Sequence, residues 1–325
     1  MREALFVKTN YPKWKSFEAV MQKNKAASPD ELADLFVQLT DDLAFARTHY
    51  PESDITRYLN NLAAGVHQRI YRNKKEDLSR FVSFWTRELP LLFREARRPL
   101  LYSFLIFIIS VGIGILSSEY DDTYARLILG DGYVNMTLEN IEKGDPMAVY
   151  KDEEMLSMFA GIAFNNLRVA FTIFAAGLVL SIGAGLILFY NGVMVGAFQY
   201  FFLQKGLFWT SFLTIWVHGT LEMASFVIAG AAGLVVGNSF LFPGTYPRME
   251  SFKRGAQKGL KMLVGVLPII VVAALLESYV TRFTDWHWSV KAVIILTSAL
   301  FMLYYFVIYP FQLERREDAG ALHKF

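Results

Sequence analysis

Apolar residues are gathered into six blocks that begin at about residue 99. An α-helix needs about 20 apolar residues to cross the hydrocarbon core of a bilayer, and these blocks are close to that length. We therefore predict an all-α protein, a polytopic bundle of about six transmembrane helices. One block, 193–208, is short and could instead re-enter the membrane, which would leave five crossings. The predicted spans are 99–116, 166–190, 193–208, 209–237, 261–277 and 290–309.

The residues before the first span follow a different pattern, in which apolar positions recur at helical spacing. Ser28 to Glu31 has the features of a helix start, with Ser28 at the N-cap, Pro29 at the first helical position and Glu31 at the third. An apolar stripe follows over 32–43, Pro51 ends that helix, and a second stripe covers 55–70. Two helices with a short connection predict an antiparallel hairpin.

Residues 76–95 combine aromatic side chains with arginines just before the first span. This pattern is typical of a helix at the membrane interface, although the same residues could pack on the hairpin. Pro90 should kink this helix. We therefore expect a cytoplasmic helical domain with an interfacial helix over 1–98, a transmembrane domain over 99–310 and a cytoplasmic tail over 311–325.

The loops differ in charge. The loop over 117–165 has three basic residues against ten acidic ones, whereas 238–260 has four basic residues and one acidic residue. Lys and Arg favour cytoplasmic loops, so we expect a multi-pass protein of the cell membrane with both termini in the cytoplasm and 117–165 outside. The acidic residues at 119–122 lack the ordered spacing of a calcium loop, and we expect a solvated, helix-containing loop there.

Composition supports a membrane protein, since 54% of the residues are hydrophobic and only 19% are charged, against about 25% charged in soluble proteins. The sequence contains no cysteine, which excludes disulfides, thiolate metal sites and Cys nucleophiles. The first twenty residues lack the apolar region of a cleavable signal peptide. A net charge of +2 gives no reason to expect a nucleic-acid partner, and the lipid bilayer is the expected environment.

Six polar residues stand within the apolar region, where such groups are costly and are paired, face water or have a function. His218 and Glu222 are four residues apart and share a helix face. They could lock helices together, relay protons or ions, or bind a metal, but zinc needs three or four ligands and we expect no metal site. Catalytic and nucleotide-binding motifs are absent, so we expect no enzyme and no cofactor. The candidate intramembrane cluster is Asn165, Asn166, Arg168, Asn191, His218 and Glu222.

Glycines in the same region indicate close helix packing, because small residues let backbones approach. The interface could lie within one chain or between two copies. Asn191-Gly192 also has the composition of a tight turn, which we predict between the second and third spans. The candidate packing glycines are Gly192, Gly196, Gly219, Gly233 and Gly237.

These residues together resemble the stage II sporulation protein M family over about 95–310. The resemblance rests on Asn165-Asn166, on Asn191-Gly192 with Gly196, and on His218-Gly219 with Glu222. Family members often have Pro where this chain has Val217, so a helix break there is in doubt.

The resemblance implies a non-enzymatic membrane scaffold that recruits partners, in spore formers those that degrade peptidoglycan. We expect a homo-oligomer, with a dimer as the first choice, and an unidentified protein partner bound through 1–95 or 117–160. The alternative is a transporter or channel-like permease with its site near His218 and Glu222.

Overall fold

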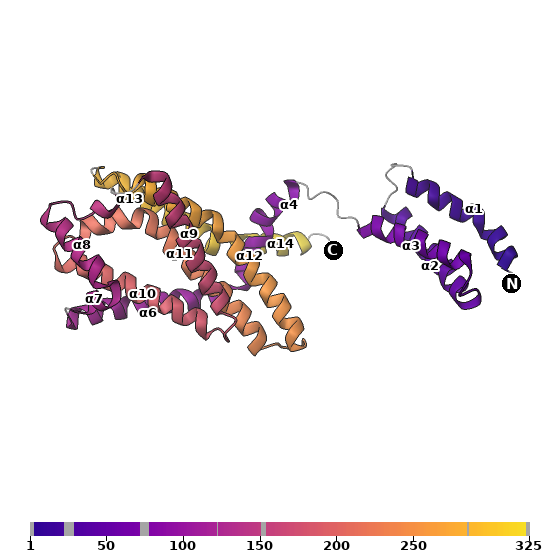
Figure 1. Ribbon diagram of the computed structural model, residues 1–325, viewed down its shortest axis with the longest axis horizontal. Coiled ribbons are helices and arrows are strands. Elements are labelled where there is room, and N and C mark those ends of the chain that lie inside the picture. Colours follow the sequence, from indigo (N-terminus) through magenta and orange to yellow (C-terminus); the bar gives the residue numbers. More distant parts are fainter. Residues whose placement is uncertain are drawn as a thin grey trace. The chain divides into compact units, whose positions relative to one another are not determined.

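In the computed structural model the described residues form helices and contain no strand. The structure describes residues 3–22, 29–71, 78–121, 123–150, 154–284 and 286–322. The chain divides into two compact units, Met1–Phe81 and Val82–Phe325. Figure 1 shows the helices of both units, and the six long apolar helices all belong to the second. The polytopic all-α fold with an N-terminal helical part is therefore confirmed.

The first unit contains three helices, α1 (Glu3–Gln22), α2 (Pro29–His49) and α3 (Asp54–Tyr71). The predicted hairpin corresponds to α2 and α3, and α2 begins at Pro29, whereas Ser28 lies outside the described residues. Helix α1 was not predicted, and it supplies three of the eight buried residues of the apolar core. The buried core residues are Phe6, Trp14, Phe17, Leu39, Leu43, Ala46, Leu59 and Ala63.

Trp14 is the central residue of this small core, since its side chain is fully buried. Its indole Nε1 donates a hydrogen bond of 2.7 Å to Asp42 Oδ2, and Lys13 Nζ lies 2.5 Å from the same oxygen. These contacts join α1 to α2. Burial is the main cause that raises the pKa of the nearby Tyr58 to about 12, with the Glu18 carboxylate adding to it.

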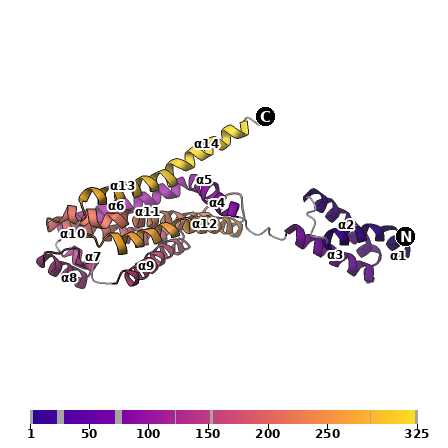
Figure 2. The same ribbon diagram turned by 90° about the horizontal axis from the view of Figure 1, so that it is seen from above.

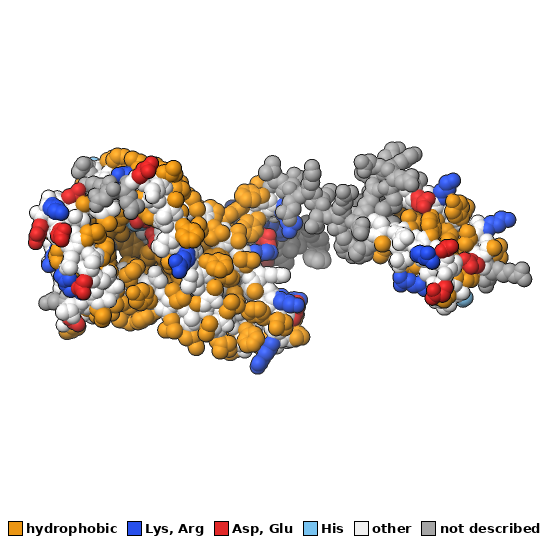
Figure 3. All heavy atoms as spheres, in the orientation of Figure 1, with side chains coloured by type: hydrophobic (Ala, Val, Ile, Leu, Met, Phe, Trp, Pro, Cys, Tyr) orange, Lys and Arg blue, Asp and Glu red, His pale blue; other side chains and the backbone are white. Residues whose placement is uncertain are grey.

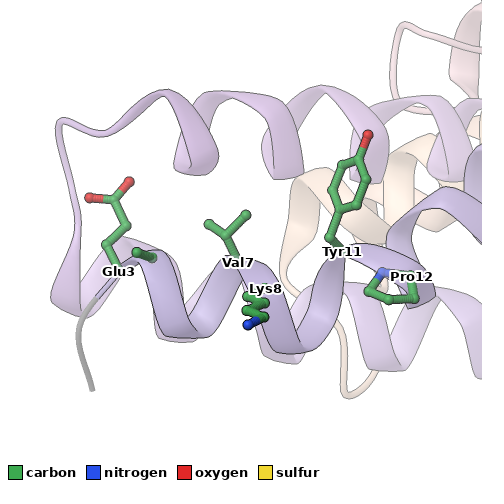
Figure 4. A pocket seen from close by; sticks show the side chains of 6 residues that line it. Glu3, Val7, Lys8, Tyr11 and Pro12 are labelled. Atoms are coloured by element: carbon green, nitrogen blue, oxygen red, sulfur yellow. The ribbon is translucent and has the colours of Figure 1, made fainter.

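Helix α1 carries a shallow groove that is lined by its own residues (Figure 4). Glu3, Val7 and Tyr11 project from one side of the helix at a spacing of four residues, and Lys8 points away from them. Apolar side chains remain exposed here, since half of the Tyr11 surface is accessible.

A broken helix precedes the first span and consists of α4 (Leu78–Ser83), a π-helical turn η1 (Phe84–Glu88) and α5 (Leu89–Glu95). The π turn immediately precedes Pro90, whose missing N–H cannot continue an ordinary α-helical pattern, and such bulges are a known cause of kinks. Leu89, Leu92 and Phe93 are buried in the core of the second unit. Residues 82–98 therefore belong to the second unit, which begins at Val82. The boundary expected from the sequence was residue 98.

Ion pairs hold η1 and α5 against α14 (Tyr309–Leu322), which belongs to the same unit. Arg94 Nε lies 2.6 Å from Glu314 Oε2, and Arg87 Nε lies 2.6 Å from Glu317 Oε1. Residues 84–95 of the predicted aromatic and arginine-rich segment thus pack on other helices of the second unit.

Among the described residues, six helices are long and apolar enough to cross a membrane. Two of them continue through π turns, α12 into η3 (Leu276–Val280) and α13 into η4 (Tyr304–Ile308), which leads to α14 (Tyr309–Leu322). Figures 1 and 2 show the long helices running side by side. The α-helical parts are α6 (Arg97–Tyr120), α9 (Met155–Ala176), α10 (Ile182–Gln204), α11 (Phe208–Leu241), α12 (Arg248–Leu275) and α13 (Trp288–Leu303).

The bundle is built around α11. Within its apolar window 67% of the residues are buried, against 22% for α6 and 17% for the last span. It packs against α6, α9, α10, α12 and α13. Polar side chains on α11 are therefore enclosed by protein, and the outer helices present their apolar residues to lipid.

The tight turn predicted at Asn191-Gly192 is wrong. Both residues lie inside α10, and the connection between α9 and α10 is at 177–181, where Leu180 and Ser181 have positive φ angles of 51° and 67°. Asn191 Nδ2 bonds to the carbonyl of Ile187, 2.8 Å away. Because the Asn191 side chain is hydrogen-bonded within its own helix, it does not require a turn at this position. Residues 193–204 of the short predicted segment are consequently the second half of a 23-residue helix.

The segment predicted as an extracytoplasmic loop folds into α7 (Tyr124–Leu129), α8 (Asp131–Glu142) and a 3-10 turn η2 (Ala148–Tyr150). Figures 1 and 2 place α7 and α8 together at one end of the bundle. Phe201 and Phe202 at the end of α10 share an apolar cluster with Ala125, Val134 and Met147. We call residues 123–150 the cap.

Candidate functional site

The candidate site begins on α11, where Thr214, His218 and Glu222 follow one another at intervals of four residues. This spacing places them on one face of the helix. His218 is only 4% exposed and Thr214 only 1%. His218 lies about 15 Å along the helix from Phe208 at 1.5 Å per residue, so the site is inside the bundle and not at its surface.

The π turn at the end of α12 brings a second set of groups to this face. His218 Nδ1 lies 3.0 Å from the hydroxyl oxygen of Thr281, and His218 Nε2 lies 3.7 Å from Glu277 Oε2. Glu222 is part of the same group, since one ligand atom from each of His218, Glu222 and Glu277 lies within 4.8 Å of the others. We call His218, Glu222 and Glu277 the triad.

Helix α9 supports the triad through an amide. Asn166 is buried and its side chain hydrogen-bonds the carboxyl group of Glu222. Asn165 Nδ2 in turn donates to Asn166 Oδ1 over 3.3 Å. A carboxylate oxygen can only accept, so the Nδ2 group of Asn166 is the donor to Glu222.

The cap also reaches the site. The ring of Tyr150, on η2, has its centroid 5.9 Å from that of His218. Burial raises the pKa of Tyr150 well above its ordinary value, and the carboxylates of Glu277 and Glu222 add to this effect. Tyr150 is therefore a neutral phenol that covers the triad from the cap side.

A lysine lies next to this group on α13. Lys291 is buried, and its Nζ donates to the carbonyl oxygen of Thr284 at 2.9 Å and to the Thr214 hydroxyl at 3.3 Å. Thr214 is one helical turn before His218. The lysine therefore extends the polar region of α11 toward the connection between α12 and α13.

Three of the six polar residues singled out in the sequence come together, namely Asn166, His218 and Glu222. Arg168 and Asn165 are exposed on α9. Asn191 bonds to its own helix and contacts the triad in no described interaction. The buried cluster is thus smaller on α9 than expected and extends instead to the end of α12.

Glu277, Thr281, Tyr150 and Lys291 were missed. Glu277 and Lys291 lie at the ends of apolar blocks, where a charge is ordinarily assigned to water or lipid headgroups. An ionisable residue at the end of each of these apolar blocks was the sequence feature that could have marked Glu277 and Lys291 as candidates. The sequence alone could not show that both side chains turn inward.

The packing glycines also divide into two kinds. A methyl group on Gly192 would lie 2.6 Å from Ser110 Cβ of α6, and one on Gly233 would lie 2.9 Å from Ala184 Cβ of α10. Gly196 and Gly237 have equally close neighbours in Val111 and Ser181. At Gly219 the nearest atom is Ile215 Cγ2 of the same helix, at 3.8 Å, so this glycine is not at a close helix contact.

Open space adjoins this part of the bundle. Figure 3 shows the surface hollowed between α8, α9, α10 and α11, with an acidic side chain visible inside the hollow. Two members of the triad, His218 and Glu222, are on α11, one of the helices that border this hollow, and Glu277 is on η3.

Two parts of the chain match known protein families. Residues 4–72 match a Domain of unknown function (DUF8413), so the first unit has a family description of its own. The comparison with curated proteins gave no match, and neither did the comparison with solved structures. Residues 103–282, more than half of the 325-residue chain, match the family Stage II sporulation protein M. The chain therefore belongs to the stage II sporulation protein M family of polytopic membrane proteins.

Proposed function

We propose that this protein is a non-enzymatic membrane scaffold that recruits partners, with cell-envelope remodelling as the process it serves. One observation carries the proposal: the chain contains two units that match different families. The membrane unit matches the stage II sporulation protein M family, and the N-terminal helical unit matches another family and has its own core. A second module of this kind, attached to a membrane anchor, is suited to holding a partner at the membrane.

The proposed orientation places both termini in the cytoplasm of a cell-membrane protein. The basic residues near the start of α12 and the start of α6 are at the end of the bundle away from the acidic cap, as the bias of Lys and Arg toward the cytoplasm requires. The first unit is then available to cytoplasmic partners and the cap to extracytoplasmic ones.

Exposed apolar residues identify the surface of the first unit to test. Leu5, Tyr11 and Val37 are each at least half exposed. We expect Leu5→Glu and Val37→Glu to abolish capture of a partner from detergent extracts, because a charge replaces the apolar contact. Asn61→Glu, on the exposed surface of α3, is the matched control and should leave capture unchanged. If no captured protein depends on either the first unit or the cap, the scaffold proposal fails.

A second candidate function is that of a transporter or channel-like permease. The specific observation in its favour is the triad itself, because ionisable groups inside spans often mark ion pathways. Ion flux into liposomes that contain the purified protein, measured beside Glu222→Gln, separates the two functions. Flux that disappears in the variant supports transport, whereas a loss of stability without any flux supports a structural role for Glu222.

A further inference from the structure

We propose that the triad of His218, Glu222 and Glu277 binds one divalent transition-metal ion, with Zn²⁺ as the first candidate. The sequence supplied only two ligands on one helix face, too few for zinc, and the structure adds the third from η3. Three protein ligands with a fourth position open to water is a common zinc coordination. The inference is independent of the scaffold proposal, since it concerns only what the triad binds.

The proton positions leave a free ligand atom on the histidine. The hydroxyl of Thr281 donates its one proton to the carbonyl of Leu276, 3.2 Å away. With that proton donated to Leu276, the hydroxyl oxygen accepts from His218 Nδ1, 3.0 Å away, and this is the tautomer that metal binding through Nε2 requires. The lone pair is then on Nε2, directed toward Glu277. A ring N–H held by a neighbouring oxygen is the usual support of a metal-binding histidine.

The distances also suit a shared cation better than a direct hydrogen bond. Nε2 and Glu277 Oε2 are 3.7 Å apart, too far for a hydrogen bond but close to the roughly 3.3–3.6 Å between two ligands of a tetrahedral zinc. The whole group of ligand atoms falls within 4.8 Å. Small side-chain rotations would bring the Glu222 carboxylate to the same ion.

Charge gives an independent reason for a cation. Two carboxylates enclosed among helices repel one another and lose hydration, which is costly unless positive charge is near. Lys291, which donates hydrogen bonds to Thr214 and Thr284, can offset at most one of these two negative charges. A divalent ion bound by Glu222 and Glu277 offsets both negative charges where they arise.

The donor set determines the class of ion. Imidazole nitrogen together with carboxylate oxygen favours Zn²⁺ and its first-row neighbours, whereas Mg²⁺ and Ca²⁺ prefer sites made of oxygen alone. Asn166 fixes the Glu222 carboxylate, and Tyr150 covers the histidine from the cap. The site thus has supporting residues as well as ligands.

The test uses the purified full chain, with any affinity tag removed, in detergent micelles or nanodiscs. After treatment with chelator, Zn²⁺ is titrated by calorimetry and the bound metal is counted by mass spectrometry. We expect one equivalent of Zn²⁺ per chain, and at least a 100-fold weaker affinity in Glu277→Gln and in His218→Gln. Mg²⁺ and Ca²⁺ should not compete. Glu119→Gln removes an exposed carboxylate at the cap end of α6 and serves as the matched control, with unchanged affinity.

A spectroscopic measurement on the wild type covers the case in which a variant fails to fold. Co²⁺ in a site of low coordination number with one nitrogen and two or more oxygen ligands gives visible d–d bands that Zn²⁺ abolishes. We expect this spectrum from the wild-type protein. A protein that takes up no stoichiometric Zn²⁺ and shows no such bands, or folded triad variants that bind Zn²⁺ as tightly as the wild type, would overturn the proposal.

Discussion

Gly233 and Gly219 lie on the same helix, α11, but only Gly233 is in close contact with other helices. A methyl group on Gly233 would stand 2.9 Å from Ala184 Cβ, 3.1 Å from the carbonyl oxygen of Ile173 and 3.2 Å from that of Phe174. It would therefore press on α9 and α10 at the same time. A methyl group on Gly219 would have only Ile215 Cγ2 near it, at 3.8 Å.

Replacement of each glycine by alanine separates the steric effect from helix propensity. Both variants gain the same roughly 1 kcal/mol of helix propensity. Only Gly233→Ala also suffers overpacking, which costs about 1–3 kcal/mol. We therefore expect Gly233→Ala to be less stable than Gly219→Ala by about 1–3 kcal/mol, with Gly219→Ala at least as stable as the wild type.

Thermal unfolding in detergent micelles measures this difference. About 2–4 °C of Tm corresponds to each kcal/mol in a domain of this size, so the two variants should differ by roughly 2–12 °C. Equal Tm values, or a lower value for Gly219→Ala, would show that α11 does not touch α9 and α10 at Gly233 as described.

Three further perturbations test the other parts of the molecule. Trp14→Ala leaves a cavity at the centre of the first unit and should lower the free energy of opening of α1 by about 3–5 kcal/mol, as measured by hydrogen exchange. Unchanged protection would place the tryptophan outside the core. Ser103→Ala removes a buried 2.6 Å hydrogen bond to the Val227 carbonyl. Because interhelical hydrogen bonds in membranes contribute little on average, the loss of stability in detergent should be only about 0.6 kcal/mol, and a loss of several kcal/mol would contradict this. Hydrogen bonds from the hydroxyl and the backbone N–H of Thr123 lower the pKa of Asp121, so their stabilising effect is present above about pH 4 and lost as the pH falls through that lowered pKa. Hydrogen exchange in α7 should accelerate on acidification beyond its intrinsic pH dependence in the wild type but not in Asp121→Asn.

The number of spans could be predicted from the sequence because lipid imposes a simple requirement, about 20 apolar residues per crossing. The connections could not be predicted in the same way. Asn191-Gly192 has turn chemistry in water, but in α10 the amide bonds to Ile187 and the glycine lets α6 approach. The actual connection contains Leu178, Val179 and Leu180, which carry no turn signal.

The candidate site was predictable only as far as local spacing reaches. His218 and Glu222 are four residues apart, and their shared helix face follows from helix geometry alone. Glu277 is separated from them by more than fifty residues, and its inward direction depends on a π turn that the sequence does not indicate. Arg168 and Asn166 are two residues apart on α9, so they face different sides, and local spacing does not indicate which of them points into the bundle.

The most direct test of this account asks which side of α9 faces the triad. The chain has no native cysteine, so pairs can be introduced without background: Asn166→Cys with Glu222→Cys, and Arg168→Cys with Glu222→Cys as the control. A short bifunctional thiol reagent is applied in membranes, and the linked peptides are identified by mass spectrometry. We expect the 166–222 pair to be linked and the 168–222 pair to remain unlinked, because Asn166 is buried against Glu222 and Arg168 is exposed. Linkage of the 168–222 pair alone would contradict the buried cluster.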